Sequence, residues 1–417
     1  MKPSPPPVHL PRAHRACRRV TAALFTLLLS AATTARAQAL YDAPTRLTIK
    51  SEVLGEERVI LVRTPPGYEH GDARFPVLYM TDGDAHLLHT SGTIGFLARN
   101  GRMPEMIVVG ITNTDRTRDL TPTRSNLKTP EGELQAPTSG GGDKFLKFIQ
   151  TELIPRIEKQ YRVEPYRVLA GHSLGGLFAL HAMVSRPELF NAYIAVSPST
   201  QWDDFYIVKR VEAFLKARKS LNRTLFVSLG NEPGNIGVGF EKLKAVLAGQ
   251  QVKDFMWDSA HLEDEDHGSV VLRSHYAGLR KVFDGWQLPR DPGTGRFAGG
   301  LQELDEHYKK LSARLGYPIV APEPLVNVFG YQLMTSGKVQ DAIAVFKLNV
   351  ERYPRSANVY DSLAEAYERA GQLDLAQTLS AKAVAVARET ADPNLNALQQ
   401  RHDHFAGLLK KPATGSH

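Results

Sequence analysis

The first candidate for chemistry is Ser173, which lies in Gly171-His-Ser-Leu-Gly175 between an apolar run and a helix-like segment. The pattern Gly-x-Ser-x-Gly is typical of a sharp turn from a strand into a helix, which raises the serine hydroxyl above a sheet. Glycines are expected there because the backbone leaves no room for a Cβ atom. A serine hydroxyl is a weak nucleophile, so this interpretation requires a base, an acid and donors for an oxyanion.

His267 is the candidate base. It lies in a polar loop soon after the strand-like run 252–257, and Gly268 and a helix-like segment follow it. A base in the loop after the last core strand fits the chain order serine, acid, histidine. His261 in the same loop is the alternative, whereas His172 is expected to shape the pocket.

Glu232 is the candidate acid that orients the base. It follows the strand-like run 224–229 and precedes a Pro233-Gly234 turn. The carboxylates of 263–266 are alternatives closer in sequence to His267, although neighbouring acids are typical of a solvated surface, because like charges disfavour burial. A Ser-His dyad without a side-chain acid is the third alternative.

An oxyanion needs two main-chain N–H donors. Leu174, directly after the serine, is expected to supply one. Gly83 or Asp84, in the turn after the strand-like run 76–80, is expected to supply the other. Since serine, histidine and main-chain donors suffice for this chemistry, we expect no metal ion and no cofactor.

The rest of the chain must position these groups. Short apolar runs alternate with helix-like segments between residues 76 and 257, which predicts a mostly parallel sheet with helices on both faces. Two β-like runs around Gly55 predict an antiparallel hairpin at one edge of this sheet. The segment 115–142 is rich in Thr, Pro, Gly and charge, so it is either a binding loop or lid, or a disordered insertion.

The chain becomes helical after a turn-rich linker at 287–300. Gly337 and Gly371 lie 34 residues apart (371 − 337), which is the period of tetratricopeptide repeats. We therefore predict an α/β-hydrolase domain at 38–286 and a small all-α domain at 301–417 with about two repeats. Two repeats are few for an independent solenoid, so this region is expected to be a packing appendage, a dimer contact or the binding site of a protein partner.

The first 37 residues differ from the rest of the chain. The whole sequence has 417 residues and a formal net charge of +7, but six basic residues and no acid lie in 1–37, which leaves +1 (7 − 6) elsewhere. A nucleic-acid partner is therefore not expected. A basic region, a short apolar run and Ala35-Arg36-Ala37 predict a signal peptide at 1–37, and hence a periplasmic or secreted protein with no membrane span after cleavage. The single cysteine, Cys17, also lies in this segment.

Five segments together resemble one known family. They are Asp82-Gly83, Arg116-Thr-Arg-Asp-Leu-Thr-Pro122, Gly171-His-Ser-Leu-Gly-Gly176, Ser197-Pro-Ser199 with Trp202, and His267-Gly-Ser-Val270. This combination resembles the Putative esterase family, which is related to esterase D and to the enterobactin and salmochelin trilactone esterases, over about residues 45–285.

The resemblance implies hydrolysis of a small-molecule carboxylic ester through an acyl-enzyme, with Ser173 and His267 as the reacting pair. A basic residue near the catecholate site of relatives corresponds to Arg116 or Arg118, and Trp202 is a further expected substrate contact. Paired aromatic residues follow the Ser-Pro-Ser segment in relatives, whereas Asp203 and Asp204 follow Trp202 here, so the resemblance does not settle siderophore specificity.

Three functions follow from these observations. The first is hydrolysis of siderophore-type or small acyl esters, and the second is acyl transfer on the same fold. The third is a protein-interaction scaffold that uses the repeats and in which the hydrolase domain is secondary or inactive. The natural ester depends on the segment 115–142 and on the residues around Trp202.

Overall fold

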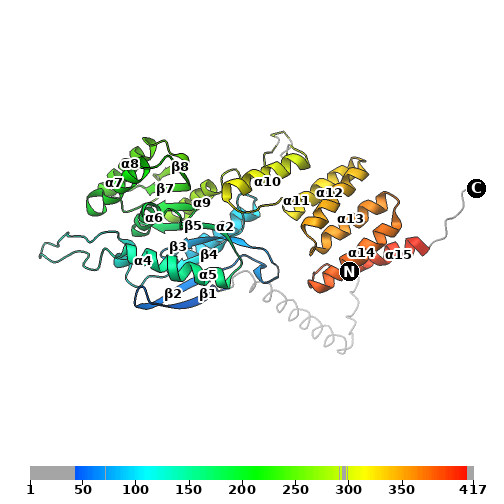
Figure 1. Cartoon of the computed structure of the whole chain (residues 1–417), viewed down its shortest axis with the longest axis horizontal. Helices are drawn as coiled ribbons and strands as arrows, with labels where there is room; N and C mark the ends of the chain where they lie inside the picture. The colour runs from blue at the N-terminus through cyan, green and yellow to red at the C-terminus, as the bar shows by residue number, and fades with distance from the viewer. Residues whose placement is uncertain (1–42, 71, 291, 294–296, 298, 411–417) are drawn as a thin grey trace, which may run out of the picture. The chain divides into compact units, whose positions relative to one another are not determined.

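The computed structural model describes residues 43–70, 72–290, 292–293, 297 and 299–410 (Figure 1). The predicted signal peptide at 1–37 lies outside the described residues. Nearly all described residues belong to one compact unit, Leu47–His417. Within the described ranges, no helix combines the length and the apolar character that a bilayer span requires.

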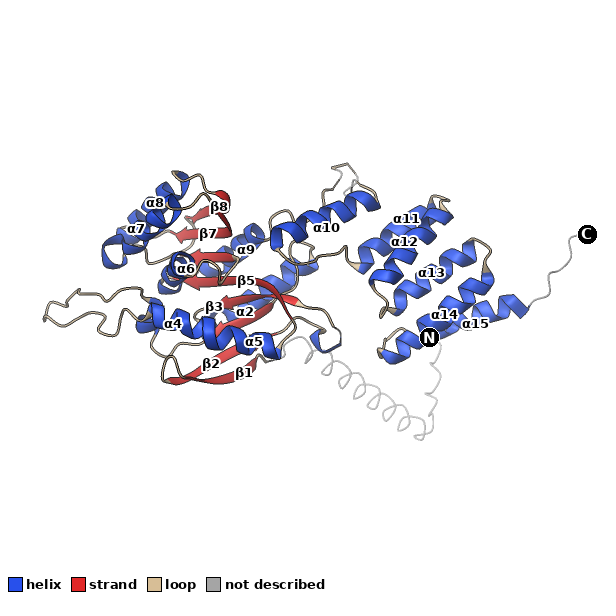
Figure 2. Ribbon diagram, viewed as in Figure 1, coloured by secondary structure: helices blue, strands red, loops and turns tan. Residues whose placement is uncertain are grey.

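An eight-stranded sheet forms the centre of the first part of the described chain (Figure 2). The strands are β1 (Thr45–Ser51), β2 (Glu56–Arg63), β3 (Phe75–Met80), β4 (Ile107–Ile111), β5 (Val163–His172), β6 (Ala192–Val196), β7 (Ser220–Gly230) and β8 (Lys253–Leu262). Their order across the sheet is β1-β2-β4-β3-β5-β6-β7-β8. β2 is antiparallel to β4, and every neighbouring pair from β4 to β8 is parallel, which confirms the predicted mostly parallel sheet.

The strand sequences reflect their places in this sheet. All residues of β4 and β6 are buried, because helices cover both faces of a central parallel strand. Buried positions alternate in β2, near the edge, and its inward side chains are Arg58, Ile60 and Val62. The inward arginine is unusual for an alternating strand, and it forms ion pairs with Glu56 and Asp119.

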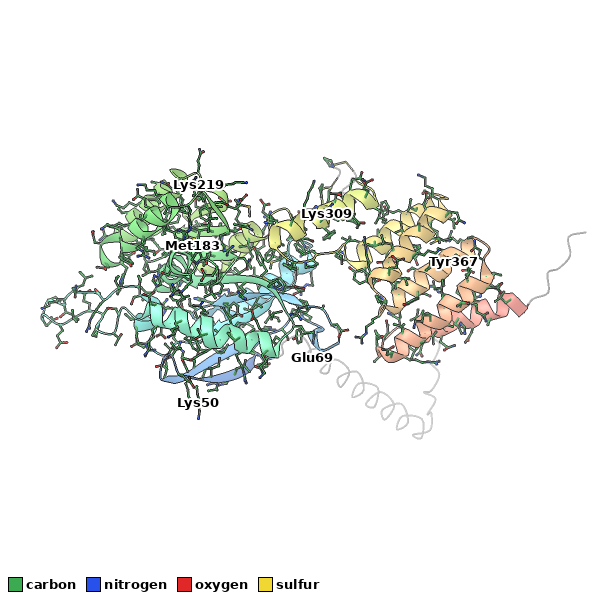
Figure 3. All side chains as sticks on the ribbon, viewed as in Figure 1. Lys50, Glu69, Met183, Lys219, Lys309 and Tyr367 are labelled. Atoms are coloured by element: carbon green, nitrogen blue, oxygen red, sulfur yellow. The ribbon has the colours of Figure 1, made fainter. Side chains whose placement is uncertain are left out.

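Helices cover both faces of the sheet. They are α2 (Gly83–Arg99), α3 (Arg116–Leu120), α4 (Gly142–Phe148), α5 (Ile154–Gln160), α6 (Leu174–Ser185), α7 (Trp202–Lys216), α8 (Asn235–Ala248) and α9 (Val270–Val282), with short helical turns η1 (Tyr68–His70) and η2 (Ile149–Leu153). Buried side chains of α4 to α8 form one core cluster, which includes Met183 (Figure 3). Buried side chains of α2 and α9 form a second cluster with the opposite face of the sheet, and this cluster includes Leu87, Leu279 and Met80 of β3.

The segment between α3 and α4 folds into a hairpin-like loop at residues 121–141. Lys128 and Leu134 form an antiparallel bridge, and the main-chain N–H of Thr129 donates to the Glu133 carbonyl oxygen over 2.7 Å. The base is fastened by the Gly140 N–H, which donates to Thr121 Oγ1 over 2.8 Å. The segment is therefore structured rather than disordered, and its role as a binding loop or lid stays a prediction.

The last part of the described chain is helical, as predicted. Its helices are α10 (Leu301–Leu315), α11 (Glu323–Thr335), α12 (Val339–Arg352), α13 (Ala357–Arg369), α14 (Leu373–Glu389) and α15 (Leu395–Lys410). α11 and α13 begin 34 residues apart (357 − 323), and so do α12 and α14 (373 − 339). Gly337 and Gly371, in the turns between paired helices, have positive φ angles of 81° and 74°. Membership of the tetratricopeptide class and the domain boundaries at 286, 300 and 301 stay predictions.

Candidate active site

Ser173 occupies the turn between β5 and α6. Its φ of 60° and ψ of −116° are unusual for a residue with a side chain, and its N–H donates to the Val196 carbonyl oxygen over 2.9 Å. A Cβ atom on Gly171 would collide with the main chain of Gly175, and a Cβ on Gly175 would collide with Thr81 Oγ1. Both glycines are therefore required by close packing. The motif predicts glycine at these positions for the same reason, because there is no room for a Cβ atom.

Glu232 and His267 meet directly. Glu232 Oε2 lies 2.5 Å from His267 Nδ1, and the Glu232 side chain is 7% exposed while that of His267 is 44% exposed. Because Nδ1 donates to the carboxylate, Nε2 is left as the proton acceptor. The His267 ring also lies 4.6 Å, between centroids, from the ring of His172, the residue directly before Ser173. The structure thus brings the predicted serine, acid and histidine to the carboxyl edge of the sheet.

The alternative base and three of the alternative acids have other partners. His261 Nε2 is 3.1 Å from the Gly230 carbonyl oxygen, at the end of β7. Asp264 and Glu265 form ion pairs with Arg273 at 2.5 and 3.1 Å. Asp266 Oδ1 accepts from the main-chain N–H groups of Gly268 and Ser269, at the entry to α9. Among Glu232 and the carboxylates of 263–266, Glu232 is the one whose contact with His267 the structure shows.

The turn after β3 supplies the second side of the site. Asp82 has a φ of 54°, and Gly83 opens α2 where a Cβ would lie 2.5 Å from the main chain of Gly110. Leu174 opens α6 in the same way. The N–H groups of Leu174, Gly83 and Asp84 belong to first helical turns, where main-chain donors have no helical acceptor. The predicted oxyanion donors are therefore placed on two helix N-termini that are in contact through Gly175 and Thr81.

Arg116 joins these two turns. Its Nε and Nη2 donate to the two carboxylate oxygens of Asp82 over 2.6 and 3.1 Å, and Nη2 also donates to the His172 carbonyl oxygen over 3.1 Å. Asn113 Nδ2 donates to Asp82 over 2.7 Å. Burial would raise the pKa of Asp82, but the hydrogen bonds and charge of Arg116 hold it below its usual value. Arg116 thus links the turn after β3 to the turn that contains Ser173, and a direct substrate contact by it stays a prediction.

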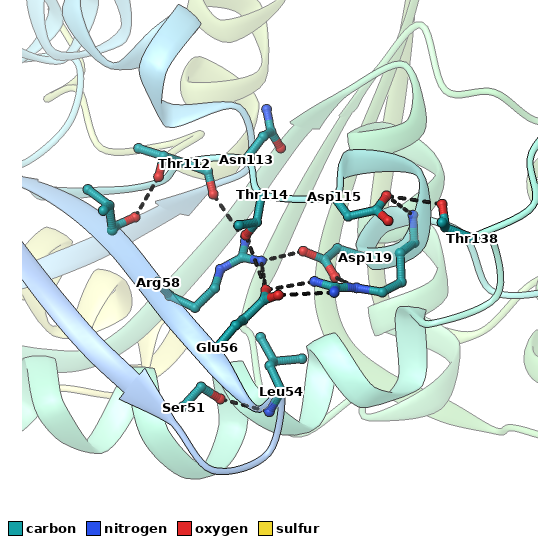
Figure 4. A network of polar contacts seen from close by, with 12 residues as sticks. Ser51, Leu54, Glu56, Arg58, Thr112, Asn113, Thr114, Asp115, Asp119 and Thr138 are labelled. Carbon is teal, nitrogen blue, oxygen red and sulfur yellow. Dashed lines mark hydrogen bonds and ion pairs between the residues drawn. The ribbon is translucent and has the colours of Figure 1, made fainter.

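Arg118, the alternative basic residue, belongs to a separate network, whose members Glu56, Arg58 and Asp119 are labelled in Figure 4. Its guanidinium forms two hydrogen bonds with Glu56, of 2.7 and 3.0 Å, and one of 2.8 Å with Asp119. These bonds with Arg118 lower the pKa of Glu56 to about 2. Arg58, 1% exposed, donates to Asp119 over 2.5 Å and to Glu56 over 2.9 Å. The sequence did not predict this network, and the only signal for it is an arginine at an inward position of β2.

Trp202 connects the serine to the 121–141 loop. Its N–H donates to the Ser199 carbonyl oxygen over 3.1 Å, and Ser199 Oγ is 3.3 Å from Ser173 Oγ. The indole Nε1 donates to Thr123 Oγ1 over 3.1 Å. The Asp203-Asp204-Phe205 stretch that follows has positive φ angles of 48°, 52° and 58°. Trp202 is thus held at the base of the loop, and its contact with substrate stays a prediction.

A cluster of histidines continues from His267 into the protein, and sequence reasoning missed it. His172 packs on His86 with ring centroids 5.7 Å apart, and His86 Nδ1 is 3.1 Å from His89 Nε2. The His89 ring stacks on His275 at 5.7 Å. Burial lowers the pKa of His86, His89 and His275, and lowers that of His172 to about 4. In the part of the chain that the structure describes, no three His, Cys, Asp or Glu residues are grouped as metal ligands.

Comparisons with known proteins identify relatives of this chain. The sequence model of the family described as "Putative esterase" matches residues 51–280. The ferri-bacillibactin esterase BesA of Bacillus subtilis (strain 168) is 33% identical over 183 residues, which are 40% of this chain and 61%, under two thirds, of that protein. The siderophore enterobactin esterase of Emericella nidulans is 35% identical over 255 residues, 49% of this chain and 81% of that protein.

Solved structures extend the likeness to the fold. An IroE-like serine hydrolase from Shewanella oneidensis is 25% identical, has a TM-score of 0.59, and is matched over 82% of this chain and 98% of that chain. The BES protein from Bacillus cereus is 28% identical with a TM-score of 0.53, over 58% of this chain and 96% of that chain. The predicted α/β-hydrolase type of fold agrees with both.

Proposed function

The chain belongs to the Putative esterase family and is a carboxylic ester hydrolase, and on this premise we propose that it acts through an acyl-enzyme formed on Ser173. The observation that carries the proposal is the contact of the buried Glu232 carboxylate with His267 Nδ1. That contact fixes the tautomer in which Nε2 accepts a proton. The strained turn at Ser173, next to a ring that packs on His267, supplies the nucleophile.

The proposed reaction has two halves. As Ser173 Oγ attacks the ester carbonyl carbon, its proton passes to His267 Nε2, and the anionic Glu232 stabilises the resulting imidazolium. The oxyanion accepts hydrogen bonds from the N–H groups of Leu174 and of Gly83 or Asp84. The carbon–oxygen bond to the alcohol then breaks, and the alcohol oxygen takes the proton from His267. A water molecule repeats the sequence on the acyl-enzyme and releases the acid and free Ser173.

We propose a siderophore-type ester as the substrate class, with small acyl esters as the alternative. Support comes from relatives that are named as esterases of ferri-bacillibactin and enterobactin. Trp202 and the 121–141 loop, which adjoin Ser199 and hence Ser173, are the proposed substrate contacts. Export to the periplasm or medium is part of the proposal and rests on the composition of residues 1–37.

A fluorophosphonate probe tests the mechanism. We expect stoichiometric labelling of Ser173 and a loss of at least about 10³-fold in kcat for Ser173→Ala. Ser185→Ala, at the far end of the same helix, is the matched control and should keep both labelling and turnover. Labelling elsewhere, or hydrolysis by Ser173→Ala at the normal rate, would contradict the proposal. A panel of ferric siderophores and p-nitrophenyl esters, with added alcohols, identifies the ester and separates hydrolysis from acyl transfer.

A further inference from the structure

We propose that Ser197 is a positioning residue that holds the Glu232 carboxylate in the orientation required by His267. The inference rests on the proposed acyl-enzyme mechanism and concerns a side chain outside the serine, acid and histidine. Ser197 directly follows β6, between the strand that ends at the nucleophile and the strand that precedes Glu232. In the sequence it is the first residue of Ser197-Pro-Ser199.

The two oxygens of Glu232 have separate partners. Oε2 faces His267 Nδ1 at 2.5 Å. Oε1 accepts from Ser197 Oγ over 2.5 Å and from the Gly230 N–H over 3.2 Å. The carboxylate plane is therefore fixed at one oxygen by Ser197 and Gly230, and the other oxygen is left to the histidine. Loss of the hydroxyl would leave one longer main-chain bond to resist rotation.

Because the acid is a glutamate and not an aspartate, its carboxylate needs the hydrogen bond from Ser197 to stay in one orientation. A glutamate side chain has three rotatable torsions, one more than aspartate, so more conformational freedom must be removed to hold its carboxylate still. A hydrogen bond to an ionised carboxylate is stronger than one between neutral groups, and it also favours one orientation. Ser197 is fully buried, so bulk water does not compete with Glu232 for the hydrogen bond of its hydroxyl.

The backbone of Ser197 supports the same conclusion. Its φ is 37°, in the left-handed region where glycine would be unstrained. The main-chain N–H of Ser197 donates to the Ser228 carbonyl oxygen over 2.8 Å, which fixes the residue in this conformation. A side chain is thus present at a position whose backbone disfavours one, and its hydroxyl is bonded to the acid. Strain of this kind at an active-site edge indicates that the side chain serves the site.

Two substitutions separate the effect of the Ser197 hydroxyl from the effect of its strained backbone. Ser197→Ala removes the hydroxyl and keeps the strained φ, whereas Ser197→Gly removes both. We expect each to lower kcat about tenfold or more, the size expected for a hydrogen bond to a charged group, with KM changed less than twofold. The Gly variant should unfold at a higher temperature than the Ala variant. Ser228→Ala is the control, because Ser228 Oγ is buried and has no hydrogen-bond partner among the described residues.

A double-mutant cycle shows whether Ser197 acts through Glu232. In a Glu232→Ala background, Ser197→Ala should have no further effect on kcat. A normal kcat in both Ser197 variants would overturn the proposal, and so would a loss of kcat in Ser197→Ala alone. The proposal would also be wrong if Ser197→Ala lowered kcat as much in the Glu232→Ala background as in the unmodified protein. Failure of the acyl-enzyme mechanism itself would be seen separately, because the fluorophosphonate probe would then not label Ser173 in the unmodified protein. If the mechanism holds, the probe should label Ser173 in the Ser197 variants too, but more slowly.

Discussion

Replacing His172 with phenylalanine should make the stability of the protein less sensitive to acid. The His172 ring is largely buried and lies between those of His86 and His267. Burial, and then the neighbouring charges of His267 and His86, lower the pKa of His172 from 6.5 to about 4. A phenyl ring would keep the packing of this position but could not take up a proton.

The sign of the effect follows from the order of these pKa values. The unfolded chain binds a proton at this residue near pH 6.5, whereas the folded protein does so only near pH 4. The contribution of His172 to stability is therefore complete above pH 6.5 and is lost as the pH falls towards 4. The difference between the two pKa values corresponds to at most about 3 kcal/mol of free energy of unfolding, of which about 2 kcal/mol is lost by pH 5.

Denaturant unfolding at pH 7.5 and pH 5 measures this difference. The three tryptophans are Trp202, Trp257 and Trp286, so their fluorescence follows the part of the chain that contains the histidine cluster. Between the two pH values, His172→Phe should lose about 2 kcal/mol less free energy of unfolding than the unmodified protein. His261→Phe, at an exposed position in the same part, is the control. An identical loss in His172→Phe and the unmodified protein would refute the reasoning.

Two further substitutions test the packing around the site and in the helical region. Asp119→Asn should lower the free energy of unfolding by about 2 kcal/mol, because the buried Arg58 would exchange one ionic partner for a neutral amide while it keeps Glu56. Urea unfolding measures this, Glu57→Gln at an exposed ion pair is the control, and equal stability of the two variants would contradict the prediction. Gly330→Ala should destabilise the C-terminal helices by about 1–3 kcal/mol, because a Cβ would overlap the Phe346 ring. Circular dichroism should show this loss while ester hydrolysis is unchanged, and a parallel fall in hydrolysis would argue against it.

The positions of the main chemical groups could be predicted because they depend on local order along the chain. A serine between glycines after an apolar run predicts a turn at the end of a strand, and the structure has Ser173 between β5 and α6. Glu232 and His267 follow later strands, and parallel strands bring their carboxyl ends to one edge. The alternating apolar runs predicted the parallel sheet for the same reason.

Contacts between residues distant in sequence could not be predicted, because they depend on which elements become neighbours. His86 on α2 and His275 on α9 are 189 residues apart (275 − 86), and only packing of both helices on the same face of the sheet brings their rings to 6.3 Å. The contact of Ser197 with Glu232 likewise requires that β6 and β7 be adjacent. The orientation of Arg116 depends on the left-handed turn at Asp82, for which the sequence Asp-Gly gives only a general turn signal.

Three residues with positive φ angles at the carboxyl edge of the sheet lower the thermal stability of the protein, and their side chains belong to the candidate site. Asp82, Ser173 and Ser197 follow the adjacent strands β3, β5 and β6, with φ angles of 54°, 60° and 37°. Each such residue costs about 1–3 kcal/mol, and a whole domain is typically stable by only about 5–15 kcal/mol. A laboratory selection for thermal resistance alone would therefore favour glycine at these three positions. It would yield a more stable protein that has lost the proposed nucleophile, the arginine-bound carboxylate of Asp82 and the Ser197 hydroxyl that donates to Glu232.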